Sequence, residues 1–276
     1  MSKVVLITGC SSGGIGYALC ERFAAEGCRV YATARRLEAM TGLDSHPLIS
    51  LLTLDVTNDD DVRRVMEQVV AQAGGIDIVV NNAGLMGIGP LIEQPLETVH
   101  SVFEANTYGT LRVAQAAFPH MAAKRSGLVI NIGSIVADIA TPWNGLYSAS
   151  KAAVRAISDT LSMEFKPFGV RVLHVAPGAV KSNIANNQEK LFSLPSTSMY
   201  RQFLPNMIQR MHSSQGPNSI PADKFAKVVV KAALKKNPPG YLTLGGNAFI
   251  FKVFGYLPKA WVLWYLWRLY SRKAAA

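Results

Sequence analysis

Tyr147 and Lys151 stand four residues apart in the segment YSASK, a spacing that places both side chains on one face of a helix. A lysine ammonium beside a phenol stabilises the phenolate and lowers the pKa of the tyrosine. A tyrosine tuned in this way can exchange a proton with a substrate oxygen near neutral pH. Because such a pair also recurs by chance, its meaning depends on the rest of the chain.

A glycine-rich turn follows the first apolar run of the chain and reads TGCSSGGIG from Thr8 to Gly16. Glycines permit a tight turn and a close approach to a pyrophosphate, and the N-terminus of a following helix offers amide donors and a positive dipole. A purely structural turn is the alternative. The position of this turn between a strand pattern and a helix pattern favours a dinucleotide site.

The end of the second apolar run carries Arg35 and Arg36, at the place where an acidic residue would bind the ribose 2′-hydroxyl of NAD. Guanidinium groups at this place suit the 2′-phosphate of NADP. A pair of solvated arginines at the end of a strand is the alternative. The sequence therefore favours NADP(H) as the cofactor and indicates no metal site.

Together with further motifs, these features resemble the short-chain dehydrogenase/reductase family. The motifs occur in the family's order over residues 3–182 and comprise the Thr8–Gly16 turn, Asp55-Val56, Asn81-Asn82-Ala83-Gly84, Asn106, Ser134, Tyr147, Lys151 and Pro177-Gly178. The resemblance implies that Ser134 hydrogen-bonds the substrate carbonyl and that Tyr147 donates a proton to it. It also implies that Lys151 holds the nicotinamide ribose and that Asn106 supports a water-mediated proton relay.

The resemblance further implies which residues bind the cofactor. Asp55 and Val56 are expected at the adenine, residues 82–84 at the ribose, and Val180 and Ser182 at the nicotinamide carboxamide. The full expected set is Gly9, Ser11, Ser12, Gly14, Ile15, Gly16, Arg35, Arg36, Asp55, Val56, Asn82, Ala83, Gly84, Tyr147, Lys151, Pro177, Gly178, Val180 and Ser182. Taken singly, Asn106 could instead be bonded to a neighbouring strand, and Ser134 could cap the end of a strand.

The glycine turn departs from the family pattern, because it is one residue longer than the usual T-G-x-x-x-G-I-G. The longer turn and the basic, aromatic C-terminal segment resemble the subgroup of fungal NADPH-dependent 1-acyldihydroxyacetone-phosphate reductases. Fungal reductases of secondary metabolism share the same features. The extra residue leaves open which amide meets which phosphate oxygen.

Apolar runs without polar alternation are spaced along the chain and are typical of strands buried on both faces. We expect strands at 4–8, 29–34, 50–55, 76–81, 128–132, 170–176 and 241–244, with helices near 16–26, 59–73, 96–123, 145–167 and 222–236. The alternation of strands and helices predicts an α/β fold with a doubly wound, Rossmann-type parallel sheet of about seven strands.

Two segments interrupt this alternation, one inside the single catalytic domain of residues 1–246 and one after it. The long, partly apolar connection 183–220 is expected to be a substrate lid rather than a plain loop, and it includes Leu191, Phe192, Met207 and Met211. The extension 247–276 is aromatic and basic. Gly255 and Pro258 break its helical pattern, and the uncharged run 260–267 is too short to span a bilayer.

The net charge of +10 arises entirely from the last third of the chain, where residues 200–276 contain 12 Lys and Arg and one acid, Asp223. Because the basic residues Lys252, Lys259, Arg268, Arg272 and Lys273 are mixed with aromatic residues, we expect peripheral contact with an anionic membrane or lipid droplet. Packing of the aromatics over the active-site cleft or in an oligomer interface is the alternative. No nucleic-acid motif is recognised.

These observations predict NADPH-dependent reduction of a ketone to a secondary alcohol, or the reverse, on a small lipophilic substrate such as 1-acyldihydroxyacetone phosphate. A steroid, terpenoid or polyketide ketone is the alternative, and a non-catalytic NADP-binding protein at a membrane surface is a third hypothesis. The free cysteines Cys10, Cys20 and Cys28 and the lack of a leader pattern favour an intracellular protein. We expect it on the cytoplasmic face of the endoplasmic reticulum or on lipid droplets, and otherwise in the cytoplasm. The resemblance implies a homodimer or homotetramer that pairs through the helices near 96–123 and 145–167.

Overall fold

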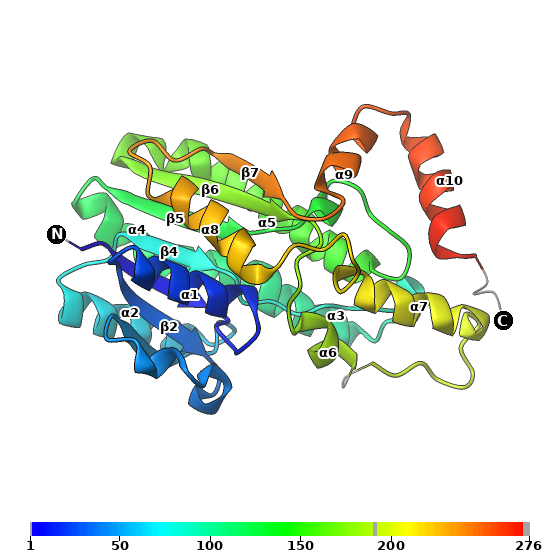
Figure 1. The fold of residues 1–276 in the computed structure, drawn as a ribbon, viewed down its shortest axis with the longest axis horizontal. Helices are drawn as coiled ribbons and strands as arrows, with labels where there is room; N and C mark the ends of the chain where they lie inside the picture. The colour runs from blue at the N-terminus through cyan, green and yellow to red at the C-terminus, as the bar shows by residue number, and fades with distance from the viewer. Residues whose placement is uncertain (1, 190–191, 273–276) are drawn as a thin grey trace.

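The computed structural model describes residues 2–189 and 192–272. Its centre is a seven-stranded sheet in which every strand runs parallel to its neighbours, in the order β3-β2-β1-β4-β5-β6-β7 (Figure 1). The strands are β1 Val4–Thr8, β2 Arg29–Ala34, β3 Ile49–Thr53, β4 Ile78–Asn81, β5 Gly127–Ile132, β6 Val170–Pro177 and β7 Tyr241–Leu244. The order reverses between β1 and β4, which is where parallel sheets of this type bind their ligands.

Helices cover both faces of the sheet. Their bounds are α1 Ile15–Ala25, α2 Asp59–Ala73, α3 Leu96–Phe103, α4 Gly109–Ala123, α5 Gly145–Glu164, α6 Ile184–Glu189, α7 Leu204–Met211, α8 Ala222–Ala233, α9 Ala248–Phe254 and α10 Lys259–Tyr270. The helices α1 and α8 pack on one face and α2, α4 and α5 on the other. The predicted doubly wound α/β fold is confirmed.

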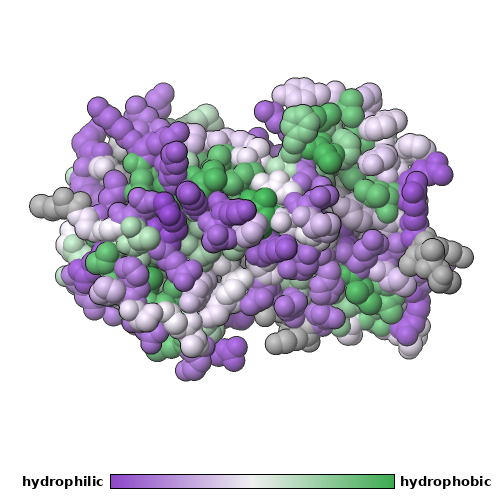
Figure 2. Space-filling view, in the orientation of Figure 1, coloured by the Kyte–Doolittle hydropathy of each residue, from purple (hydrophilic) through white to green (hydrophobic). Residues whose placement is uncertain are grey.

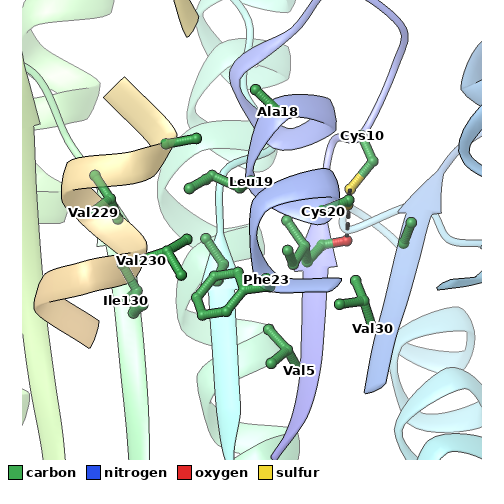
Figure 3. Packing of buried hydrophobic residues seen from close by; sticks show 14 of the residues in the cluster. Val5, Cys10, Ala18, Leu19, Cys20, Phe23, Val30, Ile130, Val229 and Val230 are labelled. Atoms are coloured by element: carbon green, nitrogen blue, oxygen red, sulfur yellow. Dashed lines mark hydrogen bonds between the residues drawn. The ribbon is translucent and has the colours of Figure 1, made fainter. Parts of the chain in front are cut away.

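Both faces of the strands are buried because alternate residues enter different layers. In β1, Val5 and Ile7 join the cluster beneath α1, whereas Val4 and Leu6 join the cluster beneath the helices on the opposite face. Phe23 of α1 is fully buried in the first layer, close to Val5 and to Val230 of α8 (Figure 3). This two-sided burial explains why the strands read as continuous apolar runs.

The predicted helix 96–123 is interrupted in the structure. The helices α3 and α4 are joined by one wide π turn, Glu104–Tyr108, which contains Asn106. Such turns insert a residue into a helix and often occur at functional sites. The predicted strands 50–55 and 76–81 are also shorter in the structure, since they form β3 and β4, and Asp55 lies beyond the end of β3.

The lid segment and the C-terminal extension both form helices beside the carboxyl ends of the strands (Figure 1). The lid segment contains α6 and α7, and its Leu191 lies outside the described residues. The extension forms α9 and α10, separated at Gly255–Pro258 as predicted, and its Lys273 also lies outside the described residues. None of the helices in the described ranges is long and apolar enough to cross a bilayer.

Candidate active site

Ser134 and the Tyr147–Lys151 pair meet beyond the carboxyl end of β5. Ser134 lies two residues after this strand and is 9% exposed, and its Oγ accepts a weak bond of 3.3 Å from the amide of Val136. Tyr147 and Lys151 lie in the first turns of α5, and all three residues line one cavity. Ser134 therefore both caps a short turn, as one alternative expected, and faces the cavity.

Lys151 is 4% exposed, and its Nζ donates a hydrogen bond of 2.8 Å to the carbonyl of Ile132. Its Nζ lies 5.7 Å from the centroid of the Tyr147 ring. Burial disfavours the charged form and lowers the pKa of the ammonium to about 8. The lysine is thus held in place by β5 while its charge remains sensitive to pH near neutrality.

Burial raises the pKa of the Tyr147 phenol to about 12, while hydrogen bonding by Ser134 and the positive charge of Arg210 lower it. The pKa of Tyr147 is thus raised rather than lowered as the spacing to Lys151 predicted, because burial outweighs the nearby positive charge. The phenol stays protonated at neutral pH and can donate its proton to an oxygen bound in the cavity. Arg210 is a cation beside the phenol that the sequence analysis did not identify.

Asn106 is fully buried in the π turn, and its side chain bonds neighbouring segments rather than the cavity. Its Oδ1 accepts from the amide of Leu85 at 2.7 Å, and its Nδ2 donates to the carbonyl of Leu85 and to Ser150 Oγ, both at 2.9 Å. The alternative of an Asn bonded to a neighbouring segment describes this geometry. Asn106 joins the end of β4 to α5, the helix that carries Tyr147 and Lys151.

The cavity connects the glycine turn with the catalytic residues. Among the predicted site residues, those that line it are Ile15, Asn82, Gly84, Ser134, Tyr147, Lys151, Pro177, Gly178, Val180 and Ser182. Gly9, Ser11, Ser12, Gly14, Gly16, Ala83 and Asn106 do not line it, nor do Arg35, Arg36, Asp55 and Val56. The sheet therefore gathers residues around one space from the carboxyl ends of β5 and β6 and from the segments that follow β1 and β4.

The glycine turn is held against the end of β4 by Thr8 and Asn82. Thr8 Oγ1 accepts from the amides of Asn82 and Ala83 at 3.0 and 3.1 Å, and Asn82 Nδ2 donates to the carbonyls of Thr8 and Gly9, both at 2.9 Å. A Cβ on Gly9 would lie 2.7 Å from Ala83 Cα, at a φ of +73°. The turn has no room for side chains here, which suits a cradle for a pyrophosphate.

The extra residue of the turn contacts the segment that follows β6. Asn183 donates from its amide to the carbonyl of Gly13 at 3.1 Å and from Nδ2 to the carbonyl of Ser12 at 2.9 Å. The amide of Ser12 donates to the carbonyl of Ala39 at 2.7 Å, and its Oγ bonds the carbonyl of Thr41 at 3.3 Å. Both donors of Ser12 are thus occupied within the protein, so this residue offers neither its amide nor its hydroxyl to a phosphate.

Arg35 and Arg36 lie at the carboxyl end of β2 and are exposed. No carboxylate of the described residues forms an ion pair with either guanidinium. Asp55 follows β3, and its Oδ1 accepts from the amide and hydroxyl of Thr57 at 2.9 and 2.8 Å. The two arginines are therefore available to an anionic ligand.

The C-terminal extension closes one side of the cavity. Trp143 Nε1 donates to the carbonyl of Tyr270 at 2.9 Å, and the ring centroids of Trp143 and Trp267 lie 5.8 Å apart. Asn206 of α7 donates to the carbonyl of Arg272 at 2.7 Å, and Tyr270 lines the cavity. The alternative that the extension covers the cleft therefore holds for its last turn.

Several cavity residues have no counterpart in the sequence-based set, including Met86, Asn144, Arg210, Met211, Phe251 and Tyr270. The buried Oδ1 of Asn144 has no hydrogen-bond partner among the described residues. These residues come from loops, the lid segment and the extension, whose sequence patterns do not show which side chains turn inward. Only the excess of apolar residues at 191–211 was a usable signal.

Comparisons with known proteins agree with this architecture. The family model for short chain dehydrogenase matches residues 3–191. The chain is 37% identical over 260 residues to the short-chain dehydrogenase ptmH of Penicillium ochrochloron, covering 93% of this chain and 94% of that protein. It is 36% identical over 230 residues to the NADPH-dependent 1-acyldihydroxyacetone phosphate reductase of Schizosaccharomyces pombe, covering 82% and 74%.

A solved structure extends the similarity to the fold. The short chain dehydrogenase of Burkholderia cenocepacia in complex with NADP superposes with a TM-score of 0.75 at 26% identity, covering 96% of this chain and 97% of that one. Sequence motifs, sheet order and the Ser–Tyr–Lys arrangement lead to the same assignment. The chain belongs to the short-chain dehydrogenase/reductase family of oxidoreductases.

Proposed function

We propose that this protein uses NADPH to reduce the ketone of a lipophilic substrate to a secondary alcohol, and that 1-acyldihydroxyacetone phosphate is the leading candidate. The observation that carries the proposal is the cavity itself, in which Ser134, Tyr147 and Lys151 face apolar side chains from the lid and the extension. NADPH would supply the hydride when bound. The reverse reaction uses the same groups.

The residues of the chain itself account for the proton and the orientation of the substrate. Ser134 donates a hydrogen bond to the ketone oxygen, and Tyr147, still protonated because of its raised pKa, delivers the proton. The ammonium of Lys151 stabilises the phenolate that remains. Asn106 acts as a positioning residue, since its bonds join α5 to the end of β4.

The cofactor is assigned from the fit of the chain. The glycine cradle and the N-terminus of α1 suit the pyrophosphate, and Gly84, Val180 and Ser182 lie along the cavity toward Tyr147. Arg35 and Arg36 suit a 2′-phosphate. The fission yeast relative is named for its use of NADPH, which supports the same cofactor here.

The lipophilic substrate is inferred from the lining of the cavity and from the relatives. Met86, Ile135, Val136, Met211 and Phe251 contribute apolar surface near Tyr147, and the fission yeast relative is named for an acylated dihydroxyacetone phosphate. A steroid, terpenoid or polyketide ketone would also fit apolar walls. Such a ketone is the second candidate. Several fungal relatives are named only as short-chain dehydrogenases, without a phosphate-bearing substrate.

We further propose that the α9–α10 surface contacts a membrane or lipid droplet, which would place the protein on the cytoplasmic face of the endoplasmic reticulum or on droplets. Phe249, Tyr256 and Trp264 are 76%, 82% and 52% exposed, and a hydrophobic patch covers this part of the molecule (Figure 2). Lys252, Lys259 and Arg268 are exposed beside them, and no acid occurs after Asp223. Homo-oligomerisation through α4 and α5 is part of the same proposal.

The first test replaces Tyr147 by Phe and measures NADPH oxidation with 1-acyldihydroxyacetone phosphate and a panel of cyclic ketones. We expect the variant to bind NADPH normally, as followed by cofactor fluorescence, but to lose at least ~100-fold in kcat because it cannot donate the proton. Undiminished turnover by the variant would remove Tyr147 from the mechanism. If the unaltered protein turns over cyclic ketones alone, the second candidate substrate is favoured. If it turns over no ketone, a non-catalytic protein is favoured.

The cofactor preference is tested by replacing Arg35 and Arg36 together with Ser. We expect the Kd for NADPH to rise by roughly 10- to 100-fold, as expected for lost bonds to a charged group, with little change in the Kd for NADH. Arg63→Ser, an exposed arginine of α2, is the matched control and should change neither value. A parallel loss of affinity for both cofactors would show that the arginines do not read the 2′-phosphate.

The pH dependence of ketone reduction should follow Lys151. Its pKa of about 8 means that the ammonium is charged below that pH and neutral above it, whereas Tyr147 stays protonated across the range. We therefore expect kcat/KM for reduction to fall as the pH rises through about 8. Lys151→Arg should move the decline to higher pH, because a guanidinium stays charged. Lys227→Arg, at an exposed position of α8, is the control, and an unshifted profile in Lys151→Arg would contradict the assignment.

Membrane contact is tested by cosedimentation with vesicles that contain phosphatidylserine. The unaltered protein should bind, and binding should weaken as salt screens the basic residues. Replacing Phe249, Tyr256 and Trp264 with Ser should abolish binding. Serine at Ile92, Met163 and Met199, which are at least as exposed as Trp264 but lie elsewhere, is the matched control. Equal behaviour of the two triple variants would contradict the proposed surface.

A further inference from the structure

Arg210 is a buried cation at the end of α7 that faces the same cavity as Tyr147. It is 7% exposed, and its positive charge partly opposes the rise in the pKa of the Tyr147 phenol that burial causes. The lid segment brings it there, since Met207 and Met211 of the same helix pack into the cluster around Trp143. The roles assigned to Ser134, Tyr147 and Lys151 do not require it.

Among the described residues, the guanidinium of Arg210 donates hydrogen bonds only to neutral hydroxyl groups. Nε donates to Thr141 Oγ1 at 3.0 Å, and Nη1 donates to Ser213 Oγ at 2.6 Å. The ring of Tyr270 lies 5.5 Å from the guanidinium carbon. Nη2 has no hydrogen-bond partner among the described residues, and none of their carboxylates lies within ion-pair distance of the guanidinium.

A buried guanidinium without a counter-charge is unfavourable, because transfer of a charge from water must be offset by paired charges and hydrogen bonds. The C-terminal end of α7 and the face of Tyr270 offset part of this cost. Burial still lowers the pKa of Arg210, which means that the site disfavours the cation that it holds. An anion in the cavity would complete the pairing.

We propose that Arg210 binds an anionic group of the substrate, a phosphate monoester or a carboxylate, that lies close to the ketone protonated by Tyr147. This inference rests on the proposed ketone reductase function and narrows its substrate class. A planar guanidinium with a free nitrogen suits the oxygens of such a group. The apolar walls then hold the acyl chain, and Arg210 holds the charged end.

The surroundings of Arg210 place it on the substrate side of the cavity. Thr141 lies in the connection between β5 and α5, Ser213 in the lid segment and Tyr270 in the extension. None of these three segments contains a residue that was expected to bind the cofactor. The 2′-phosphate of the cofactor has its own arginines, Arg35 and Arg36, at the end of β2.

The test compares two ketones that differ only in the phosphate group, 1-acyldihydroxyacetone phosphate and the same acyldihydroxyacetone with a free hydroxyl in place of the phosphate. We expect Arg210→Gln to lower kcat/KM for the phosphate by about 100-fold, the size expected for lost bonds to a charged group, and to change the value for the neutral ketone by less than ~3-fold. Arg210→Lys keeps the positive charge but lacks the planar guanidinium with its several N–H donors, and it should show an intermediate loss of kcat/KM for the phosphate. Arg201→Gln removes an exposed lid arginine and is the matched control.

The outcomes separate substrate binding from other roles of Arg210. An equal loss on both ketones, with a shifted pH profile, would show that Arg210 acts through Tyr147 and would overturn the proposal, as would no loss on either ketone. A β-keto acid and its methyl ester form a second pair, and selective loss on the acid alone would identify a carboxylate as the anion. Thermal melting and NADPH fluorescence report whether each variant is folded and binds the cofactor.

Failure of the proposed reductase function is distinguishable from failure of this inference. If the unaltered protein with NADPH turns over none of these ketones, the reductase proposal is wrong. Binding of the phosphate-bearing ketone to the NADP-loaded protein, measured by isothermal titration calorimetry, still tests Arg210. Equal affinity of the unaltered protein and Arg210→Gln would then overturn the proposal, and a selective loss for the phosphate would support it.

Discussion

The close contact between the glycine turn and the end of β4 is the constraint on which the rest of the site depends. Thr8 and Asn82 tie the two segments together through main-chain and side-chain bonds, and the missing side chain of Gly9 lets Ala83 approach. Because β1 and β4 flank the point where the strand order reverses, this contact lies where parallel sheets of this type bind their ligands. Every cavity residue is placed relative to that edge.

Burial acts in opposite directions on the two catalytic groups of α5. It keeps Tyr147 protonated and brings the pKa of Lys151 close to neutrality. The carbonyl of Ile132 accepts a hydrogen bond from the Lys151 ammonium and holds it near the Tyr147 ring. Asn106 contributes from the π turn, where a regular helix would present a different side chain to Leu85 and Ser150. The packing around α5 thus sets both the pKa values of Tyr147 and Lys151 and the position of the helix that carries them.

The lid segment and the extension define the substrate end of the cavity. Trp143 and Asn206 donate to the carbonyls of Tyr270 and Arg272, at and just after the end of α10. Arg210 is enclosed between Thr141, Ser213 and Tyr270. The same extension leaves aromatic side chains of α9 and α10 exposed, among them Phe249 and Trp264. One element therefore combines an inner surface that closes the cleft with an outer surface that suits a lipid interface.

The sequence by itself determined the family motifs, the doubly wound sheet and the Ser134, Tyr147 and Lys151 set, because strand burial, glycine turns and helical spacing are local patterns. It also identified the break at Gly255–Pro258. Tertiary structure alone decided that Asn106 bonds Leu85 and Ser150, that Asn183 holds the longer turn, and that Arg210 faces Tyr147. Those contacts join segments between 21 and 171 residues apart, or depend on which way a lid helix turns, and no local pattern encodes either.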